Sequence, residues 1–455
     1  MLSKTLTLSI IALLIGVNII SIINAESATG NQPLTNNCSN GYTLCSVQPI
    51  VPNDKFNDMF NLSSHILLID MDGNIVKKWS SGLYHAKMLP NGSILSKIVY
   101  NDETRRFSNL TQLGWNGSVE WNFDCNWIDE NSNLIYGNHH DFQREGNPVG
   151  YYAPGQDFTE NGKTLILAHK NTYNPHVSWR EFKDDVIYEV DWNGSLTGFE
   201  WHASDHIDEM GFDLKSRIGM WINPGGLGRW LMIAIGDLLH INTISYLGKN
   251  KWYDMGYEEF NPNNIMITSR HANFLIIIEK ETGDIVWRIG PNFLENPEEN
   301  KLGQIIGPHH AHIIPDGLPG AGNILVFDNG GLAGYGLFGN PNKFRLYSKV
   351  IEFNPLTNEI VWVYQFKNGL SFLIRQGKYH KFFSITMSSA QRLPNGNTLI
   401  TEGFTGRVFE VTPDNEVVWE YLVGRSYKIY RAYRIPPEWV PGNPAKYPFF
   451  GSENT

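Results

Sequence analysis

Apolar and polar residues alternate along much of the chain in short runs that end at Gly, Asn or Asp. Six runs share one pattern: an apolar segment, a turn, and an alternating segment that ends in Trp. Period-two alternation on both sides of a short turn predicts a β-hairpin. The six predicted hairpins are LLIDMDGNIVKKW (67–79), LTQLGWNGSVEW (110–121), IYEVDWNGSLTGFEW (187–201), IIIEKETGDIVW (276–287), VIEFNPLTNEIVW (350–362) and VFEVTPDNEVVW (408–419).

The repeat predicts an all-β protein, and specifically a six-bladed β-propeller. Successive terminal Trp residues are separated by 42 positions (Trp79 to Trp121) up to 86 positions (Trp201 to Trp287), which suits four-stranded blades with variable insertions. Tandem β-sandwiches would also contain hairpins, but would not end six of them with the same Trp. The composition agrees, because 24 Phe, 20 Tyr and 14 Trp favour strands while 43 Gly and 23 Pro favour turns.

The chain is expected to have four parts. These are a signal peptide or N-terminal membrane anchor at 1–25, an N-terminal extension at 26–61, the propeller at 62–430 and a C-terminal tail at 431–455. Lys4 precedes an apolar run from Leu6 to Ile23, which is typical of an export signal or a short anchor. Within the propeller, the segment near 62–79 is expected to complete a blade with the C-terminal region.

Several features fit a protein that works outside the cell membrane. Cys38 and Cys45 are close enough for a small disulfide loop, whereas Cys125 is expected to be buried. Six Asn-x-Ser/Thr sites are compatible with export and glycosylation: Asn37, Asn61, Asn91, Asn109, Asn116 and Asn193. The net charge is −10 and no basic run is present, so nucleic acid is not an expected partner.

A second motif, a short strand followed by a turn, precedes five of the hairpins. Its copies are YHAKMLPNGSIL (84–95), HHDFQREGN (139–147), LLHINTISYL (238–247), PHHAHIIPDGLPGAGNIL (308–325) and SSAQRLPNGNTLI (388–400). When the copies are aligned on the turn, His85, His310 and Ser389 occupy equivalent positions. Two positions further on, the aligned residues are Lys87, His312 and Gln391. His140 and His240 fall within about one residue of the first of these positions. Because the first strand of a blade lines the channel, these residues are expected to form a circle of histidines around it.

Imidazoles can bind metals, move protons or act as nucleophiles. Metal sites usually add carboxylates, and only Asp141 and Asp328 lie near these motifs, so no metal site is expected. The chain has no GxSxG elbow and no P-loop, which gives no support to serine hydrolysis or nucleotide phosphate binding. Several histidines with nearby arginines suit a sulfate or phosphate ester, whose oxygens they could hold.

The same stretches resemble the arylsulfotransferase (ASST) family, over about residues 65–425. The resemblance is carried by DLLHINTISYLGKNKWYD (237–254), NNIMITSRHANFLIIIEKETGDIVWRIGP (263–291), GQIIGPHHAHIIPDGLPGAGNILVFDNGG (303–331), YSKVIEFNPLTNEIVWVY (347–364) and AQRLPNGNTLITEGFTGRVFEVT (390–412). It implies a secreted or periplasmic six-bladed propeller. It also implies sulfuryl transfer from a phenolic sulfate to a phenol through a transient sulfohistidine, without a phosphoadenosine cofactor.

By motif, His240 and His310 match the sulfate-binding histidines of that family, whereas Arg407 stands where the family's nucleophilic histidine is expected. We therefore expect catalytic roles for His240, His310, His140, Arg270 and Arg407, and substrate-binding roles for His85, His309, His312, Asn242 and Arg392. The expected partners are a small aromatic sulfate donor and a phenolic acceptor, and no cofactor is expected. The rivals are an extracytoplasmic propeller that binds a metal or a sulfated ligand without turnover, and a quinone-dependent redox propeller.

Overall fold

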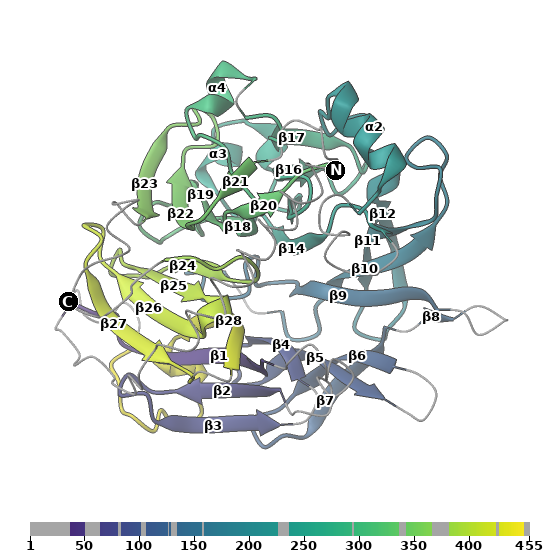
Figure 1. Ribbon diagram of the computed structural model, residues 1–455. Coiled ribbons are helices and arrows are strands. Elements are labelled where there is room, and N and C mark those ends of the chain that lie inside the picture. Colours follow the sequence, from purple (N-terminus) through teal and green to yellow (C-terminus); the bar gives the residue numbers. More distant parts are fainter. Residues whose placement is uncertain are drawn as a thin grey trace.

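The computed structural model describes residues 37–50, 64–80, 83–101, 106–125, 127–128, 134–156, 159–225, 236–293, 295–335, 343–365, 382–424 and 427–449. In these residues, six sheets of antiparallel blade strands surround one axis, so the predicted all-β, six-bladed propeller is confirmed (Figure 1). The inner strands β4, β9, β14, β18, β24 and β28 face the centre of the view in Figure 1. The expected export signal at 1–25 lies outside the described residues.

Each blade is numbered here along the chain and described from its inner strand outward. Blade 1 consists of β4 (Leu83–Met88), β5 (Ile94–Asn101), β6 (Arg106–Leu113) and β7 (Val119–Asp124). Blade 2 consists of β9 (Leu134–Arg144), β10 (Thr164–Thr172), β11 (Phe182–Val190) and β12 (Leu196–His202). Blade 3 consists of β14 (Ile241–Tyr246), β15 (Ile265–Ser269), β16 (Phe274–Ile278) and β17 (Ile285–Ile289). Blade 2 also carries two short strands, β8 (Trp127–Ile128) beside β9 and β13 (Gly236–Asp237) parallel to β11.

The last three blades follow the same plan. Blade 4 consists of β18 (His309–Ile313), β19 (Ile324–Asp328), β22 (Lys349–Phe353) and β23 (Ile360–Gln365). Blade 5 consists of β24 (Ser389–Arg392), β25 (Thr398–Glu402), β26 (Arg407–Val411) and β27 (Val417–Leu422). Blade 6 consists of β28 (Tyr427–Ile435), β1 (Tyr42–Pro49), β2 (His65–Ile69) and β3 (Ile75–Ser80). A small separate sheet pairs β20 (Gly331–Ala333) with β21 (Lys343–Arg345).

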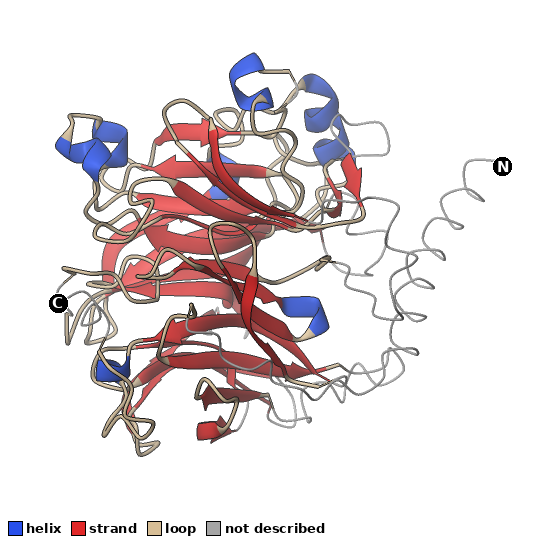
Figure 2. Ribbon diagram, turned by 90° about the vertical axis from the view of Figure 1, so that its left-hand side faces the viewer, coloured by secondary structure: helices blue, strands red, loops and turns tan. Residues whose placement is uncertain are grey.

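Helices are few and short. Figure 2 shows them at the periphery of the stacked sheets. They are α2 (Leu214–Ile222), α3 (Lys251–Asp254), α4 (Pro297–Asn300) and the 3₁₀ turns η2 (Ala203–Asp205), η4 (Glu258–Phe260), η6 (Gly403–Thr405) and η7 (Pro437–Trp439). No helix in the described part of the chain is long and apolar enough to cross a membrane.

The two ends of the chain meet in blade 6. β1 pairs with β2 on one side and with β28 on the other, so a C-terminal strand is the inner strand of a blade whose outer strands are N-terminal. The expected pairing of 62–79 with the C-terminal region is therefore confirmed. The expected propeller limits at 62 and 430 were wrong, because β1 lies in the supposed extension and β28 runs into the supposed tail. Both strands bury nearly all their side chains against neighbouring blades.

The six predicted hairpins are the outer two strands of the six blades, and five of their six terminal Trp residues join one blade to the next. The indole N–H of Trp121 donates to the carbonyl of Trp192 in the blade 2 turn at 2.7 Å, and that of Trp201 donates to Gly283 in blade 3 at 3.0 Å. The remaining links of this kind run from Trp287 to Pro355, from Trp362 to Pro413 and from Trp419 to Met71. The repeated Trp is thus an inter-blade anchor.

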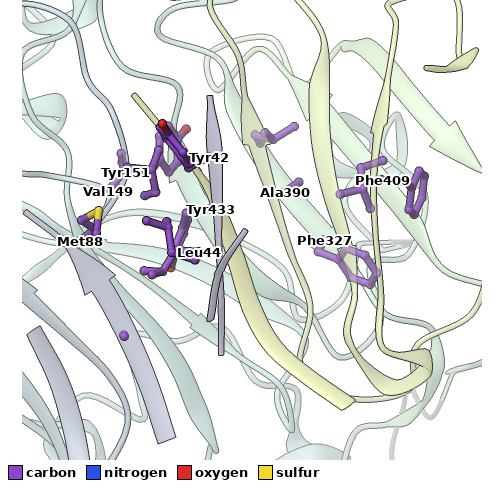
Figure 3. Packing of buried hydrophobic residues seen from close by; sticks show 14 of the residues in the cluster. Tyr42, Leu44, Met88, Val149, Tyr151, Phe327, Ala390, Phe409 and Tyr433 are labelled. Atoms are coloured by element: carbon purple, nitrogen blue, oxygen red, sulfur yellow. The ribbon is translucent and has the colours of Figure 1, made fainter. Parts of the chain in front are cut away.

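The core lies between blades as well as within them. Figure 3 shows Tyr42 and Leu44 of β1 and Tyr433 of β28 close to Met88 of β4 and Tyr151, all buried. Removing these apolar surfaces from water is the main force that closes the circle of blades.

The expected disulfide was wrong. Among the described residues, Cys38 and Cys45 are not joined, and Cys45 is a fully buried thiol in β1. Burial raises the pKa of Cys45 to about 12, so this thiol stays protonated and unreactive at neutral pH. Cys125 is buried, as predicted.

Candidate active site between blades 2 and 3

Three inner-strand histidines share an unusual backbone conformation. His140, His240 and His310 have φ angles of 48°, 52° and 53°, which fall in the left-handed region. In each of these blades the pairing between the inner strand and its neighbour shifts register at or next to the histidine. Such bulges re-aim side chains, and a non-glycine residue held in this region costs about 1–3 kcal/mol and is typical of functional sites. The three motif histidines therefore occupy equivalent, strained positions.

The structure does not place all the predicted residues in one circle. It separates them into two groups of titratable side chains. The first, which we call the axial cluster, lies on the inner strands of blades 1, 2 and 6 and consists of His85, Lys87, Asp141 and Arg431. The second, which we call the histidine cluster, joins blades 2 and 3 and consists of His139, His140, His169, Asp185, Asp237, His240 and His271.

The axial cluster is a closed network of opposite charges. Asp141 accepts from Arg431 at 2.9 Å and lies 2.8 Å from the Lys87 ammonium. Arg431 also donates to the carbonyl of Asn242 at 2.7 Å and to the Thr243 hydroxyl at 2.9 Å. These side chains are at most 4% exposed, so the network fills the axis with compensated charge.

Protonation in the axial cluster follows from this pairing. Burial opposes ionisation of Asp141, but Arg431 and Lys87 outweigh it and hold the pKa of Asp141 well below its usual range. Burial lowers the pKa of Lys87 to about 8 and that of His85 to about 3. His85 is therefore neutral and packs 4.9 Å (ring centroids) from Tyr430. The predicted substrate-binding residue His85 belongs to this buried network.

The histidine cluster is organised around two carboxylates. Asp237 Oδ2 accepts from His240 Nδ1 at 2.6 Å, and its Oδ1 lies 3.3 Å from His169 Nε2. Asp185 Oδ1 lies 3.2 Å from His139 Nε2 and 3.6 Å from His169 Nε2. Asp185 is completely buried, whereas the side chains of Asp237 and His240 are 22% and 24% exposed. This cluster therefore reaches the surface.

The two carboxylates oppose each other's ionisation. Burial and the neighbouring Asp237 raise the pKa of Asp185 well above its usual range. Burial also disfavours the charged form of Asp237, but His240 and His169 outweigh it and hold the pKa of Asp237 well below its usual range. The cluster thus keeps negative charge on Asp237, directly behind His240.

Hydrogen bonds fix which nitrogen of each ring is free. The Nδ1 of His240 faces a carboxylate, and the Nδ1 of His271 lies 3.0 Å from the Asp237 carbonyl. Both partners can only accept, so each Nδ1 carries a hydrogen and each Nε2 of a neutral ring carries a lone pair. In the described part of the chain, neither Nε2 has a hydrogen-bond partner. The His140 ring lies 4.5 Å from the His240 ring.

Arg270 differs from the other predicted arginines. Arg392 pairs with Glu352 at 2.5 Å, and Arg407 pairs with Glu420 at 2.5 Å and lies 3.5 Å from Glu402. These two residues, predicted to bind substrate and to be catalytic, are used in ion pairs within the scaffold. Arg270 has no carboxylate partner in the described residues; its only side-chain bond is a 3.5 Å contact to the Ile385 carbonyl.

The remaining predicted residues lie in blades 3 and 4. His309 bonds Asn329 Oδ1 at 2.7 Å, and Arg270 is the charged group that most strongly lowers the pKa of His309 after burial itself. His310 donates from Nδ1 to the Ala390 carbonyl, and its ring packs 4.7 Å from that of His312.

The side chains of His312 and Asn242 are used within the fold. His312 bonds the Tyr151 hydroxyl at 2.7 Å, and Asn242 donates to the Pro308 carbonyl at 2.8 Å. Of the predicted histidines, His140 and His240 are the pair that the fold brings together across blades 2 and 3.

The sequence analysis missed six members of these clusters. His139 was missed although it directly precedes the predicted His140. His169, Asp185, Asp237 and His271 come from second and third strands and from connections, outside the repeated inner-strand motif, and Arg431 lies in the supposed tail. The only available signal was the match of His and Asp residues at paired positions of β10 and β11, where His169 stands opposite Asp185.

A model of the family described as "Arylsulfotransferase (ASST)" matches residues 156–424, more than half of the chain. The chain belongs to the arylsulfotransferase family. The match runs from the second strand of blade 2 (β10) to the end of blade 5 (β27) and includes His169, Asp185, Asp237, His240 and His271. The whole axial cluster lies outside the residues that match the arylsulfotransferase model.

No curated protein matches the sequence. Similar solved structures include a protein of unknown function from Bacteroides caccae (12% identity, TM-score 0.44, 87% of this chain and 99% of that chain). They also include the Dos1 propeller (9% identity, TM-score 0.35, 80% of this chain and 66% of that chain). Another is a catalytically inactive virginiamycin B lyase from Staphylococcus aureus with quinupristin (12% identity, TM-score 0.33, 87% of this chain and 88% of that chain). These distant likenesses add nothing to the assignment of the site.

Proposed function

We propose that this arylsulfotransferase-family protein transfers a sulfuryl group from a phenolic sulfate ester to a phenolic acceptor, that His240 carries the group between them, and that no nucleotide cofactor takes part. Family membership supports aryl sulfuryl transfer in general. The 2.6 Å contact between His240 Nδ1 and Asp237 carries the choice of residue.

The Asp237–His240 pair supports a nucleophilic role for His240 Nε2. A carboxylate that accepts the Nδ1 hydrogen fixes the ring, leaves the lone pair on Nε2 and stabilises the positive charge that forms when Nε2 makes a bond. Two other histidines of the inner-strand motif lack this combination: His309 and His310 bond neutral oxygens and are 2% exposed. His240 is both activated and within reach of solvent.

The proposed reaction has two balanced steps. In the first, the lone pair on Nε2 attacks sulfur, the bond from sulfur to the aryl oxygen breaks, and the phenolate leaves. In the second, the acceptor phenol loses its proton as its oxygen attacks the same sulfur, and the nitrogen–sulfur bond breaks. The proton lost by the acceptor equals the proton gained by the released phenolate.

Arg270 is the residue proposed to hold the sulfuryl oxygens. A buried guanidinium without a carboxylate partner is ready for an anion, and a fixed donor costs little reorganisation when charge develops. We also propose that the reaction takes place outside the cell membrane, because the apolar run at Leu6 to Ile23 is typical of an export signal.

The test is release of a coloured phenol from an aryl sulfate, with a second phenol as acceptor and no nucleotide. His240→Asn is the informative variant, because Asn tolerates the left-handed backbone that His240 adopts. We expect it to lose at least about 10³-fold in rate. The control is His176→Asn, which alters an exposed histidine–aspartate pair on the surface and should keep the full rate.

Two outcomes would contradict the proposal. If folded wild-type protein releases no phenol from any of several aryl sulfates, the propeller is a binding protein. If turnover occurs and His240→Asn keeps it, another histidine carries the group.

A further inference from the structure

We infer that this protein binds one divalent first-row transition-metal ion between blades 2 and 3. The four ligands are two imidazoles and two carboxylates, namely His139, His169, Asp185 and Asp237. The site adjoins His240 but does not use its ring, and its existence does not depend on the proposed sulfuryl transfer.

The spacing of the ligand atoms fits a small metal ion. The three measured separations are 3.2 Å (His139 Nε2 to Asp185 Oδ1), 3.6 Å (His169 Nε2 to Asp185 Oδ1) and 3.3 Å (His169 Nε2 to Asp237 Oδ1). Ligands about 2.0–2.1 Å from a tetrahedral ion lie about 3.3–3.4 Å from one another. Three of the six ligand-to-ligand separations of such a site are therefore close to these distances.

The same atoms are not satisfied by hydrogen bonds. His139 Nε2, His169 Nε2 and Asp237 Oδ1 are buried and have no hydrogen-bond partner among the described residues, although each lies near an atom of opposite polarity. An unsatisfied buried polar atom costs about 1–3 kcal/mol. One cation in contact with all of them would remove this cost at three atoms together.

The charge of the site also favours a divalent ion. Asp185 and Asp237 together supply two negative charges when both are ionised, and both approach the same imidazole. Two carboxylates that approach one imidazole repel each other, and a cation between them would offset this repulsion. Imidazole and carboxylate ligands together suit a divalent transition ion such as Zn²⁺.

Three of the four ligands are held by a second contact, as in metal sites generally. His139 Nδ1 lies 2.7 Å from His140 Nδ1, and Asp237 Oδ2 accepts from His240. Asp185 accepts the backbone N–H groups of Leu239 and Ile241 at 3.3 and 3.1 Å. A metal on His139 Nε2 would leave the hydrogen on Nδ1, which would then donate to His140 and leave a hydrogen on His140 Nε2.

Metal binding has one geometric consequence. The rings of His139 and His169 are stacked, with centroids 3.5 Å apart and planes at 13°. A metal lies in the plane of each ring that binds it, so both rings must tilt to share one ion. The loaded protein should therefore show these planes opened well beyond their present angle.

This inference replaces the expectation of no metal site. That expectation rested on the few carboxylates near the inner-strand motif, namely Asp141 and Asp328. Asp141 is used by Arg431 and Lys87, and Asp328 accepts from the Ile306 backbone. The fold supplies two other carboxylates from β11 and β13.

The test uses the full-length protein, treated with a chelator, loaded with excess Zn²⁺ and passed through a desalting column. We expect one retained zinc per chain by elemental analysis. We also expect His169→Gln and Asp185→Asn each to weaken zinc binding by at least about 100-fold in calorimetric titration. The matched control is His176→Gln, in which an exposed histidine beside Asp208 is changed; it should bind zinc like the wild type.

Circular dichroism of each variant separates loss of binding from loss of folding. Conservative Asp185→Glu offers a second variant at the same ligand, and it should bind more weakly than the wild type but better than Asp185→Asn. Wild-type protein that retains no zinc would overturn the inference. So would zinc that is retained equally by both ligand variants, since the ion would then lie elsewhere. Neither readout uses activity, so failure here leaves the sulfuryl-transfer proposal standing.

Discussion

The axial cluster and the histidine cluster are built from the same kinds of side chain and differ in how they are satisfied. In the axial cluster, Asp141 is matched by both Arg431 and Lys87, and its members are at most 4% exposed. In the histidine cluster, Asp185 and Asp237 have imidazoles and no Lys or Arg as ion-pair partners in the described part of the chain, where several buried ring and carboxylate atoms also lack a hydrogen bond.

The difference indicates where chemistry can occur. A buried network whose charges cancel holds the inner strands together and offers nothing to a ligand. A cluster with excess negative charge, free Nε2 atoms and partial exposure is ready for a cation and for a reacting group. The repeated inner-strand motif contributes to both clusters, so the motif alone does not identify the site.

The largest expected effect comes from breaking the charge balance of the axial cluster. Asp141→Asn leaves Lys87 and Arg431 buried without a counter-charge, and it should lower the free energy of unfolding by about 3–5 kcal/mol. Denaturant unfolding of metal-free protein measures this. Asp185→Asn, under the same conditions, leaves one of the two backbone N–H groups that bond Asp185 without an acceptor, so it should cost less, about 1–3 kcal/mol. Equal losses would show that the two clusters do not differ in this way.

Loss of the unpaired arginine should affect rate more than stability. Arg270→Gln should lower kcat/KM by about 10²–10³-fold, because it removes a donor to the sulfuryl oxygens. Most of the loss should fall on kcat. Arg217→Gln is the control, since Arg217 pairs with Asp208 on the surface. Unchanged kinetics for Arg270→Gln would remove Arg270 from the site.

Acid should destabilise the protein through its buried neutral histidines. Burial lowers the pKa of His312 from the usual 6.5 to about 4. Below pH 6.5 the unfolded chain binds a proton that the folded chain does not, so stability falls as the pH drops from about 6.5 towards 4. His312 alone should contribute a loss of about 2 kcal/mol between pH 7 and pH 5.

Unfolding curves at several pH values measure this loss, and His312→Gln should show a shallower dependence than the wild type. An unchanged slope in the variant would mean that His312 does not titrate as described.

The smallest expected effect is the difference between two Trp substitutions, one at a Trp whose indole N–H makes a hydrogen bond and one at a Trp whose indole N–H does not. Trp419→Phe removes the indole bond to Met71 at 2.7 Å, whereas the indole N–H of Trp79 has no hydrogen-bond partner in the part of the chain that the structure describes. Both substitutions remove similar buried surface, so Trp419→Phe should cost about 1–2 kcal/mol more than Trp79→Phe. Thermal or denaturant unfolding measures the difference, and equal costs would argue against the inter-blade role of the indole bond.

The fold could be predicted largely because its signal is local and repeated. Each hairpin carries its own alternation and its own terminal Trp, so six similar segments indicate six blades. The closure of blade 6 was harder to delimit, because β1 and β28 are single strands without a hairpin turn of their own. Their pairing joins Tyr42 to Ile435, nearly 400 positions apart.

The site could be predicted only in part, because the inner-strand histidines recur but their partners do not. His140 and His240 were found from the motif, whereas Asp185 and Asp237 come from strands without any repeated feature. The contact between Arg407 and Glu402 could have been predicted from the sequence, since Glu402 stands directly opposite Arg407 in the β25–β26 pair. Cross-strand pairing therefore distinguishes structural arginines from Arg270 better than position near a motif does.

Mass spectrometry of the intermediate tests most directly whether His240 carries the sulfuryl group. Wild-type protein would be mixed with an aryl sulfate, without an acceptor, then digested quickly at alkaline pH to preserve a nitrogen–sulfur bond. We predict one SO₃ group on the peptide that contains His240, its disappearance when a phenol is added before digestion, and its absence from His240→Asn. An SO₃ group on His140, His309 or His310 instead, or turnover with no labelled histidine, would contradict the assignment of His240.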